Sequence, residues 1–270
     1  MKKIMAVMLA AAISASLCAC SGAELEKTHA EEHEAIQVVL VQNKEDGQDQ
    51  PSAEEGEAEV SEDAYAGWFD DAVFVGDSVS VKLQNYVEPD SMLGDAEFLC
   101  AVSLGYNNSL WELDRKGNVH PLYKGKKVTV DEGIKQTKKK KVFIMLGMND
   151  IGMGVDFAID GMKTLTDRIM EKNPGVQIYI QSVTPMLKNT KRSDQLNNKN
   201  IALFNEQAKE ICKQRGYEYI DVASSVDDGH GNLLYDNCGD SGYMGLHFSN
   251  AGCEKWVKCL KAFAASKDSA

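Results

Sequence analysis

Four residues of this sequence, Ser78, Gly105, Asn149 and His247, are of the types that acyl-transfer chemistry requires. A serine hydroxyl can attack an ester carbonyl once a histidine removes its proton, and N–H groups can hold the negative oxygen that forms. Each residue also has an ordinary structural explanation, because serine caps helices, glycine and asparagine form turns, and a lone histidine is often structural. The functional interpretation therefore depends on whether the fold brings the four together.

Three of these residues follow short apolar segments that predict buried strands. These are residues 72–75 before Ser78, residues 97–102 before Gly105, and residues 141–147 before Asn149. An unbroken apolar run of this length is typical of a strand that is covered on both faces. Because parallel strands end at one edge of the sheet, where open α/β folds bind ligands, we expect the three residues to converge there.

The rest of the chain continues the alternation of strands and helices. Two more strands are expected over residues 176–181 and 217–222, and a small hairpin or ordered loop within residues 107–131. Helical patterns cover residues 81–87, 131–141, 156–172 and 251–265. A further long helix is expected after the polar residues 188–198, and it ends at Arg215. This alternation calls for right-handed crossovers on both faces of a parallel sheet. The sequence therefore predicts an α/β fold, a three-layer α/β/α sandwich around a five-stranded parallel sheet.

His247 lies between a loop rich in Gly and Asp, residues 227–245, and the predicted last helix. From that position an imidazole can turn toward Ser78 and act as its base. Taken in order, Gly76-Asp77-Ser78, Gly105, Gly147-Met148-Asn149-Asp150 and His247 resemble the four blocks of the SGNH (GDSL-type) hydrolase family, over roughly residues 70–265.

The resemblance implies a flavodoxin-like sheet, ester hydrolysis or acyl transfer, and no metal or other cofactor. It implies that Ser78 is the nucleophile and His247 the general base. It further implies an oxyanion site made of the Ser78 N–H, the Gly105 N–H and the side chain of Asn149.

One position departs from the family pattern. Members commonly carry an Asp three residues before the histidine, where its carboxylate fixes the imidazole tautomer, and here that residue is Met244. Either a backbone carbonyl orients His247, or an Asp of the preceding loop substitutes, Asp240 being the nearest and Asp236 the next. A site that has lost its orienting carboxylate loses much of its activity, so a degenerate, non-catalytic site is the third alternative.

The amino-terminal part of the chain predicts export and a lipid anchor. Residues 1–19 have the basic start and short apolar core of a signal peptide. Leu17-Cys18-Ala19-Cys20 resembles a bacterial lipobox with Cys20 as the lipidated residue, and an ordinary secretory signal cut nearby is the alternative. We expect the mature protein to be lipid-anchored at the outer face of the bacterial cytoplasmic membrane.

An acidic segment separates this signal from the hydrolase-like domain. Residues 21–63 contain fourteen Asp and Glu and two Lys, and so carry as much net negative charge as the whole chain, −12. Such a composition predicts a disordered tether over residues 20–63 and a nearly neutral domain over residues 64–270. Nothing in this charge pattern suggests nucleic-acid binding.

The cysteines of the domain indicate neither a metal site nor a disulfide framework. Its five cysteines lack the CxxC or Cys/His spacing of zinc sites, and an odd number cannot all pair. The sequence does not decide whether Cys238 forms a disulfide, and it leaves the states of Cys253 and Cys259 unassigned as well.

These features lead to one main functional hypothesis, a cell-surface serine esterase that hydrolyses acyl esters. Short-chain or O-acetyl esters of cell-wall or extracellular polysaccharide are the expected substrates, and Tyr106, Trp111 and Tyr123 could stack on a sugar. The alternatives are an O-acyltransferase that acts on a cell-envelope glycan and a non-catalytic glycan-binding lipoprotein.

Overall fold

The fold was analysed in a computed structural model that describes residue 65 and residues 67–268. The predicted signal peptide, Cys20 and the acidic segment lie outside the described residues. Among the residues that the structure does describe, no helix is long and apolar enough to cross a membrane.

Five parallel strands form the central sheet, as the sequence predicts. The order across the sheet is β2-β1-β5-β6-β7, so β1 lies between β2 and the central strand β5. The chain thus leaves β1 toward β2 and returns to the other side of β1 as β5, so the direction of winding reverses between β1 and β5. Ligands of open α/β sheets bind at such a reversal. The strands are β1 (Ala72–Gly76), β2 (Glu97–Cys100), β5 (Lys141–Met145), β6 (Gln177–Gln181) and β7 (Glu218–Ile220).

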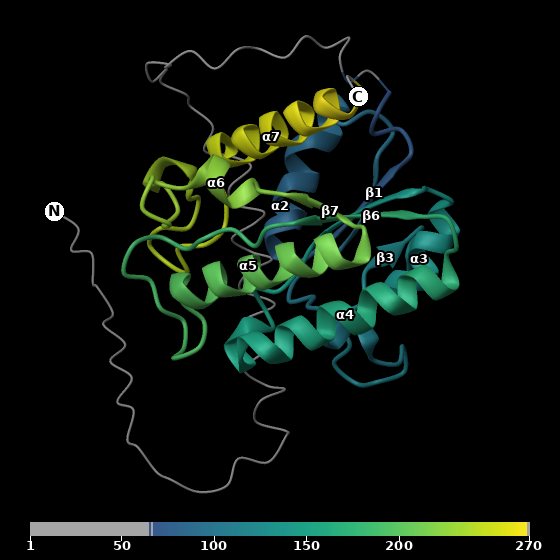
Figure 1. The fold of residues 1–270 in the computed structure, drawn as a ribbon, viewed down its shortest axis with the longest axis horizontal. Helices are drawn as coiled ribbons and strands as arrows, with labels where there is room; N and C mark the ends of the chain where they lie inside the picture. Colours follow the sequence, from purple (N-terminus) through teal and green to yellow (C-terminus); the bar gives the residue numbers. More distant parts are fainter. Residues whose placement is uncertain (1–64, 66, 269–270) are drawn as a thin grey trace, which may run out of the picture.

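Helices cover both faces of the sheet and complete three layers (Figure 1). Helices α2, α6 and α7 lie on one face, and α3, α4 and α5 lie on the other (Figure 1), in agreement with the contacts of α7 with α2 and α6 and of α4 with α3 and α5. The helices are α2 (Ser78–Val87), α3 (Val130–Thr137), α4 (Val155–Lys172), α5 (Asn198–Arg215), α6 (Val222–Val226) and α7 (Asn250–Asp268). Short 3-10 helices are η2 (Glu88–Asp90), η3 (Asn108–Leu110), η4 (Ile151–Met153) and η5 (Tyr235–Asn237).

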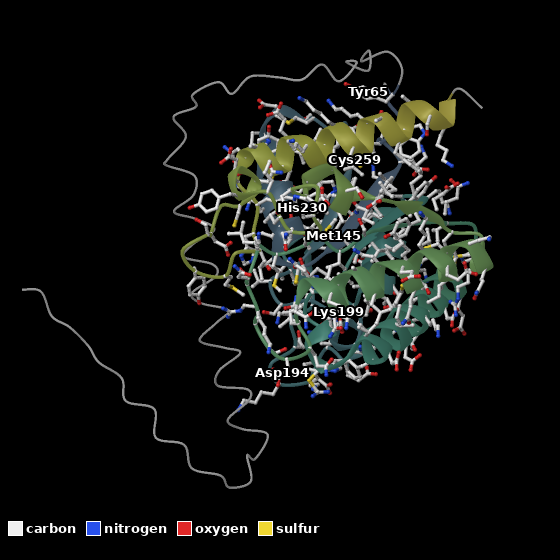
Figure 2. All side chains as sticks on the ribbon, turned by 60° about the vertical axis from the view of Figure 1, so that its left-hand side comes forward. Tyr65, Met145, Asp194, Lys199, His230 and Cys259 are labelled. Atoms are coloured by element: carbon white, nitrogen blue, oxygen red, sulfur yellow. The ribbon has the colours of Figure 1, made fainter. Side chains whose placement is uncertain are left out.

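Aromatic rings on adjacent strands form the centre of the core. Phe74 pairs with Phe143, and Phe143 with Tyr179, in the strand registers. Their rings stack with centroids 4.7 and 4.6 Å apart. Side chains fill the space between the layers, and Met145, the last residue of β5, lies well inside the molecule (Figure 2). Burial of large apolar side chains on both faces of the strands anchors the edge at which the polar loops emerge.

The structure refines several of the predicted boundaries. The predicted hairpin is present as β3 (Leu122–Tyr123) and β4 (Lys126–Lys127). The fifth strand ends at Ile220 because Asp221 caps a short helix, α6, by accepting a hydrogen bond from the Ser224 N–H. All five cysteines of the described region are free thiols, so the disulfide left open for Cys238 does not form.

Candidate active site

Ser78 is the first residue of helix α2, directly beyond the end of β1. Asp77 caps this helix, because its Oδ1 accepts a hydrogen bond from the Val79 N–H at 2.9 Å. Residue 76, which precedes Asp77, must be glycine, since a Cβ there would lie 1.9 Å from Ser80 Oγ. The turn therefore holds the Ser78 hydroxyl at the carboxyl edge of the sheet, with only 7 % of the residue exposed. Its own N–H belongs to the first helical turn, where no helix carbonyl is available to accept it.

His247 bridges Ser78 and Asp240. Its Nε2 lies 2.9 Å from Ser78 Oγ, and its Nδ1 lies 2.6 Å from Asp240 Oδ2. Because a carboxylate only accepts hydrogen bonds, the imidazole donates its Nδ1–H to Asp240 and leaves Nε2 to accept the Ser78 hydroxyl proton. His247 is 3 % exposed, so both bonds are shielded from water.

Asp240 is held in place by several donors. Its Oδ1 accepts the N–H groups of Leu246 and His247 at 2.9 and 3.1 Å. The Cys238 thiol donates to the same oxygen at 3.3 Å, and burial raises the pKa of Cys238 to about 12, so this thiol keeps its proton. The pKa of Asp240 lies below its usual value. Burial alone would raise it, but the hydrogen bond and charge of His247, together with the other donors, outweigh the effect of burial.

A short ladder positions Asp240 opposite the histidine. Cys238 forms an antiparallel bridge with Phe248, and the Gly239 N–H donates to the carbonyl of His247 at 2.8 Å. The chain between these partners folds into a tight loop that returns Asp240 to the imidazole. Of the two loop carboxylates considered from the sequence, the structure brings Asp240 to His247 and leaves Asp236 exposed. Met244, at the position of the family's usual Asp, packs against apolar residues that include Val102.

Asn149 and Gly105 lie at the same sheet edge, and both already have partners. Asn149 Nδ2 donates to the Leu104 carbonyl at 3.0 Å and lies 3.4 Å from Asp77 Oδ2. The Gly105 N–H donates to Asn108 Oδ1 at 2.8 Å. The structure therefore joins the loops that follow β1, β2 and β5, and it directs the Gly105 N–H at a side chain of its own loop.

Asp150 holds the backbone that directly follows Gly105, a contact that sequence reasoning missed. Its carboxylate accepts the N–H groups of Tyr106 and Asn107 at 2.8 and 3.0 Å and the Asn107 side chain at 3.0 Å. A Cβ at position 105 would lie 2.6 Å from this carboxylate, so only glycine fits. Burial raises the pKa of Asp150 despite these bonds. The motif Gly147-Met148-Asn149-Asp150 drew attention to Asp150, but it did not indicate which groups Asp150 contacts.

Asp77 is a second buried acid beside the Ser78 turn. It is 2 % exposed, and desolvation raises its pKa to about 6, although the Val79 N–H and the His247 charge oppose that rise. Asp150 adds like charge to the same region. The edge of the sheet thus concentrates three buried carboxylates around one serine and one histidine.

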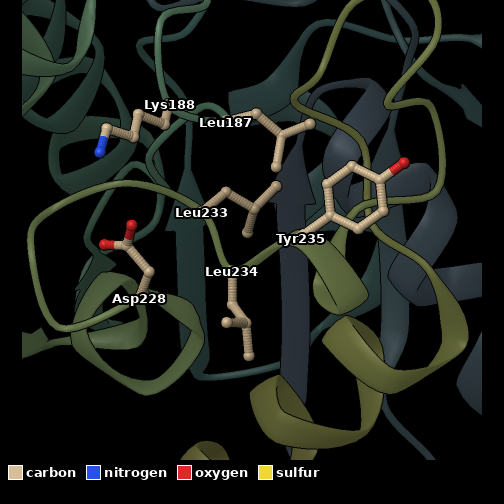
Figure 3. A pocket seen from close by; sticks show the side chains of 6 residues that line it. All are labelled: Leu187, Lys188, Asp228, Leu233, Leu234 and Tyr235. Atoms are coloured by element: carbon tan, nitrogen blue, oxygen red, sulfur yellow. The ribbon is translucent and has the colours of Figure 1, made fainter.

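A pocket of about 350 Å³ lies beside the loop that carries Asp240. Figure 3 shows the polar ends of Lys188 and Asp228 on one side, the Tyr235 ring on the other and three leucines between them. Two hydrogen bonds connect the pocket wall to the loop that carries Asp240. The Leu187 N–H donates to the Gly245 carbonyl, and the Ser241 hydroxyl donates to the Tyr235 hydroxyl. Neither Ser78 nor His247 lines this pocket.

Two of the three aromatic residues considered for sugar stacking are unsuited to it. Tyr106 and Tyr123 are buried in the core, so neither ring can meet a ligand. Trp111 is partly exposed, but Arg115 covers its ring at 3.4 Å. Within the described part of the chain, no group of three or more His, Cys, Asp or Glu is arranged to hold a metal ion.

Solved structures similar to this chain share its fold. A Streptococcus pneumoniae protein named as a candidate platelet activating factor is 18 % identical, with a TM-score of 0.56, and covers 90 % of this chain and 97 % of its own. A GDSL-like lipase from Bacteroides thetaiotaomicron is 13 % identical, with a TM-score of 0.53 and coverages of 90 % and 98 %. A lipase/acylhydrolase from Enterococcus faecalis is 16 % identical, with a TM-score of 0.52 and coverages of 73 % and 96 %. A search of curated protein sequences found no match.

The sequence profile of the GDSL-like Lipase/Acylhydrolase family matches residues 102–255, more than half of the chain. The matched region contains Gly105, Asn149, Asp240 and His247 and begins after Ser78. Together with the five-stranded parallel sheet between two helical layers, this match confirms the fold and the family that the sequence motifs predict. The chain belongs to the GDSL-like lipase/acylhydrolase family, whose members share the SGNH hydrolase fold.

Proposed function

We propose that this protein hydrolyses acyl esters with Ser78 as nucleophile, His247 as general base and Asp240 as the carboxylate that orients the base. The observation that carries the proposal is the continuous chain of contacts from Ser78 Oγ to His247 Nε2 at 2.9 Å and from His247 Nδ1 to Asp240 Oδ2 at 2.6 Å. These contacts satisfy the geometric requirement for an activated serine. Membership of an acylhydrolase family agrees with this chemistry.

In the first half-reaction, Ser78 Oγ attacks the ester carbonyl carbon while its proton passes to His247 Nε2. The carbonyl oxygen becomes an oxyanion, which N–H groups of Ser78, Gly105 and Asn149 stabilise. The carbon–oxygen bond to the alcohol then breaks, and the alcohol leaves with the proton from Nε2. Asp240 stabilises the imidazolium that exists between these two proton transfers.

In the second half-reaction, water replaces the alcohol. His247 Nε2 removes a proton from the water as its oxygen attacks the acyl carbon, and a second oxyanion forms. Its collapse breaks the bond to Ser78 Oγ, which recovers its proton from Nε2. The carboxylic acid is released and the side chains return to their starting state.

For substrate and location, the proposal extends to short-chain or O-acetyl esters, carbohydrate esters among them, at the outer face of the cytoplasmic membrane. It rests on the signal-like residues 1–19, on Cys20 in a lipobox-like context and on the acidic residues 21–63. The membrane partner would be reached through acyl chains on Cys20, and no nucleic-acid partner is proposed.

An O-acyltransferase would use the same first half-reaction and give the acyl group to a sugar hydroxyl instead of water. Supplying an acyl donor with and without a glycan acceptor, and measuring transfer against free acid, separates the two reactions. The non-catalytic alternative arises from Met244 at the position of the usual Asp. The contact between Asp240 and His247 supports the catalytic proposal over it.

The direct test is hydrolysis of short-chain aryl esters by the full chain and its Ser78→Ala variant. Ser80→Ala is a matched control, because Ser80 is a buried serine of the same helix, whereas the hydroxyl that bonds His247 is that of Ser78. We expect Ser78→Ala to lose about 10³-fold or more in kcat and Ser80→Ala to keep its activity. Equal rates for the wild type and folded Ser78→Ala would refute the assignment.

A further inference from the structure

Asn108, the first residue of η3, closes the loop that carries the Gly105 N–H. Its Oδ1 accepts that N–H at 2.8 Å, and its Nδ2 donates to the Ser103 carbonyl at 2.8 Å. Ser103 adopts a left-handed backbone with φ of 62°, so the carbonyl and the N–H both face the same side chain. Both ends of the Asn108 amide are thereby used within residues 103–108.

An N–H group has one hydrogen, and here that hydrogen points at Asn108 Oδ1. The Ser78 N–H differs, since it belongs to a first helical turn and has no helix carbonyl to accept it. Asn149 Nδ2 carries two hydrogens, which it shares between the Leu104 carbonyl at 3.0 Å and, over a longer 3.4 Å, Asp77 Oδ2. In the absence of substrate, the Gly105 N–H is thus the one proposed donor that is held by a side chain of its own loop.

We propose that Asn108 caps the oxyanion site in the resting protein and must release the Gly105 N–H during the reaction. This inference rests on the proposed esterase function. A neutral ester carbonyl competes with the Asn108 oxygen on equal terms, because both are uncharged acceptors. An oxyanion competes far better, since hydrogen bonds to charged acceptors are roughly twice as strong. The third donor thus becomes available chiefly in the transition state, where stabilisation increases the rate.

The bond between Gly105 and Asn108 must nevertheless be broken in each half-reaction, and this slows both. Removing the Asn108 side chain leaves the N–H free to meet the oxyanion. We expect Asn108→Ala to raise kcat by about fivefold to tenfold, the equivalent of one neutral hydrogen bond, with KM changed by less than about twofold. Asn108→Asp should lower kcat by about tenfold or more, because a carboxylate binds the N–H more strongly and repels the oxyanion.

The alternative role for Asn108 is a structural cap, in which a side chain bonds back to the N–H at the start of a helical turn. A cap that only orders the loop predicts the opposite result, a fall in kcat for Asn108→Ala. The two roles are therefore separated by the sign of the change.

The experiment compares aryl-ester kinetics of the full-length wild type, Asn108→Ala and Asn108→Asp. Asn118→Ala is a matched control, because Asn118 also bonds loop carbonyls, those of Leu113 and Arg115, but is half-buried and makes these bonds at the surface. Thermal unfolding verifies that every variant is folded at the assay temperature. An unchanged or lower kcat for folded Asn108→Ala overturns the inference.

Two further readouts keep this test separate from that of the esterase itself. If the wild type has no ester hydrolysis that Ser78→Ala removes, the proposed function fails, and the Asn108 variants then have no rate to change. Hydrogen exchange of the Gly105 amide needs no activity. It should be slow in the wild type and at least tenfold faster in Asn108→Ala, and equal exchange rates would show that Asn108 does not cap this N–H.

Discussion

Asp240 Oδ2 lies 2.6 Å from His247 Nδ1, although the two residues are seven positions apart. A carboxylate three positions before the histidine would be the family's usual arrangement, and Met244 stands there instead. The pairing of Cys238 with Phe248 closes the intervening loop and brings the more distant acid to the imidazole. A displaced acid thus reaches the same ring nitrogen by a different backbone path.

Asp240→Asn should strongly reduce activity. The amide can present its N–H to Nδ1 and so favour the wrong imidazole tautomer, which leaves Nε2 unable to accept the serine proton. We expect kcat to fall by about 10²- to 10⁴-fold with a small change in KM. Asp236→Asn is the matched control, since Asp236 lies in the same loop but is exposed. Equal kcat values for the two folded variants would contradict the role of Asp240.

Met244→Asp should bring no gain. His247 Nδ1 already has its carboxylate, and a new one would replace a side chain that packs on Val102. Burial of an extra charge near Asp240 costs stability and cannot add a second bond to one N–H. We expect equal or lower kcat/KM and a lower unfolding midpoint, with Met244→Leu close to wild type in both. A tenfold rise in kcat for Met244→Asp would indicate that Asp240 does not orient the imidazole.

Asp150→Asn should weaken the site by loosening the Gly105 loop. The amide offers one acceptor oxygen where the carboxylate receives three hydrogen bonds, and its NH₂ group would face backbone N–H donors. We expect the free energy of unfolding to fall by about 2 kcal/mol. The value of kcat should fall about tenfold, because the loop no longer aims its donor. Full activity in the folded variant would show that the bonds of Asp150 to residues 106 and 107 are not needed to position the Gly105 N–H.

Asp77→Asn should change the pH dependence of stability. Because burial raises the pKa of Asp77 from 3.8 to about 6, the folded protein binds this proton more tightly than the unfolded chain does. The contribution of Asp77 to wild-type stability is therefore fully present below about pH 4 and is lost as pH rises through the window from 3.8 to about 6. Asn cannot ionise, so the variant escapes this loss, which amounts to about 3 kcal/mol.

Denaturant unfolding at pH 4 and pH 7.5 measures this effect. The stability of Asp77→Asn relative to wild type should rise between the two pH values, and the N-cap should survive because an Asn oxygen can accept the Val79 N–H. The exposed Asp90→Asn serves as the control and should show no such rise. A difference between Asp77→Asn and wild type that does not depend on pH would mean that Asp77 ionises as easily in the folded state as in the unfolded one.

The sequence predicts the strands and long helices of this protein better than the conformations of its loops. Apolar runs such as residues 72–75 and 141–147 identify the strands because burial on both faces demands them, and polar residues directly after a strand must lie at its carboxyl end. Helix α6 was missed because five residues give no periodic pattern, and because its cap, Asp221, and its first residue, Val222, were placed in the predicted strand over residues 217–222.

The sequence could not predict how the loops fold or which loops contact one another. Asp240 could be named only as the nearer of two loop carboxylates, because the bridge between Cys238 and Phe248 depends on how a loop without periodicity folds back. The bond between Gly105 and Asn108 depends on the left-handed Ser103, which no local pattern signals. The contact of Asp150 with residues 106 and 107 requires two loops separated by more than forty positions.

The central claim, that Ser78 is an activated nucleophile, is tested most directly by a fluorophosphonate. The reagent forms a bond between phosphorus and an activated serine oxygen, fluoride leaves, and the adduct can be located by mass spectrometry of the full chain after digestion. We predict one adduct, on Ser78, which is absent from Ser78→Ala and retained in Ser80→Ala. A folded protein that remains unlabelled at Ser78, or that is labelled equally after Ser78→Ala, would contradict the claim.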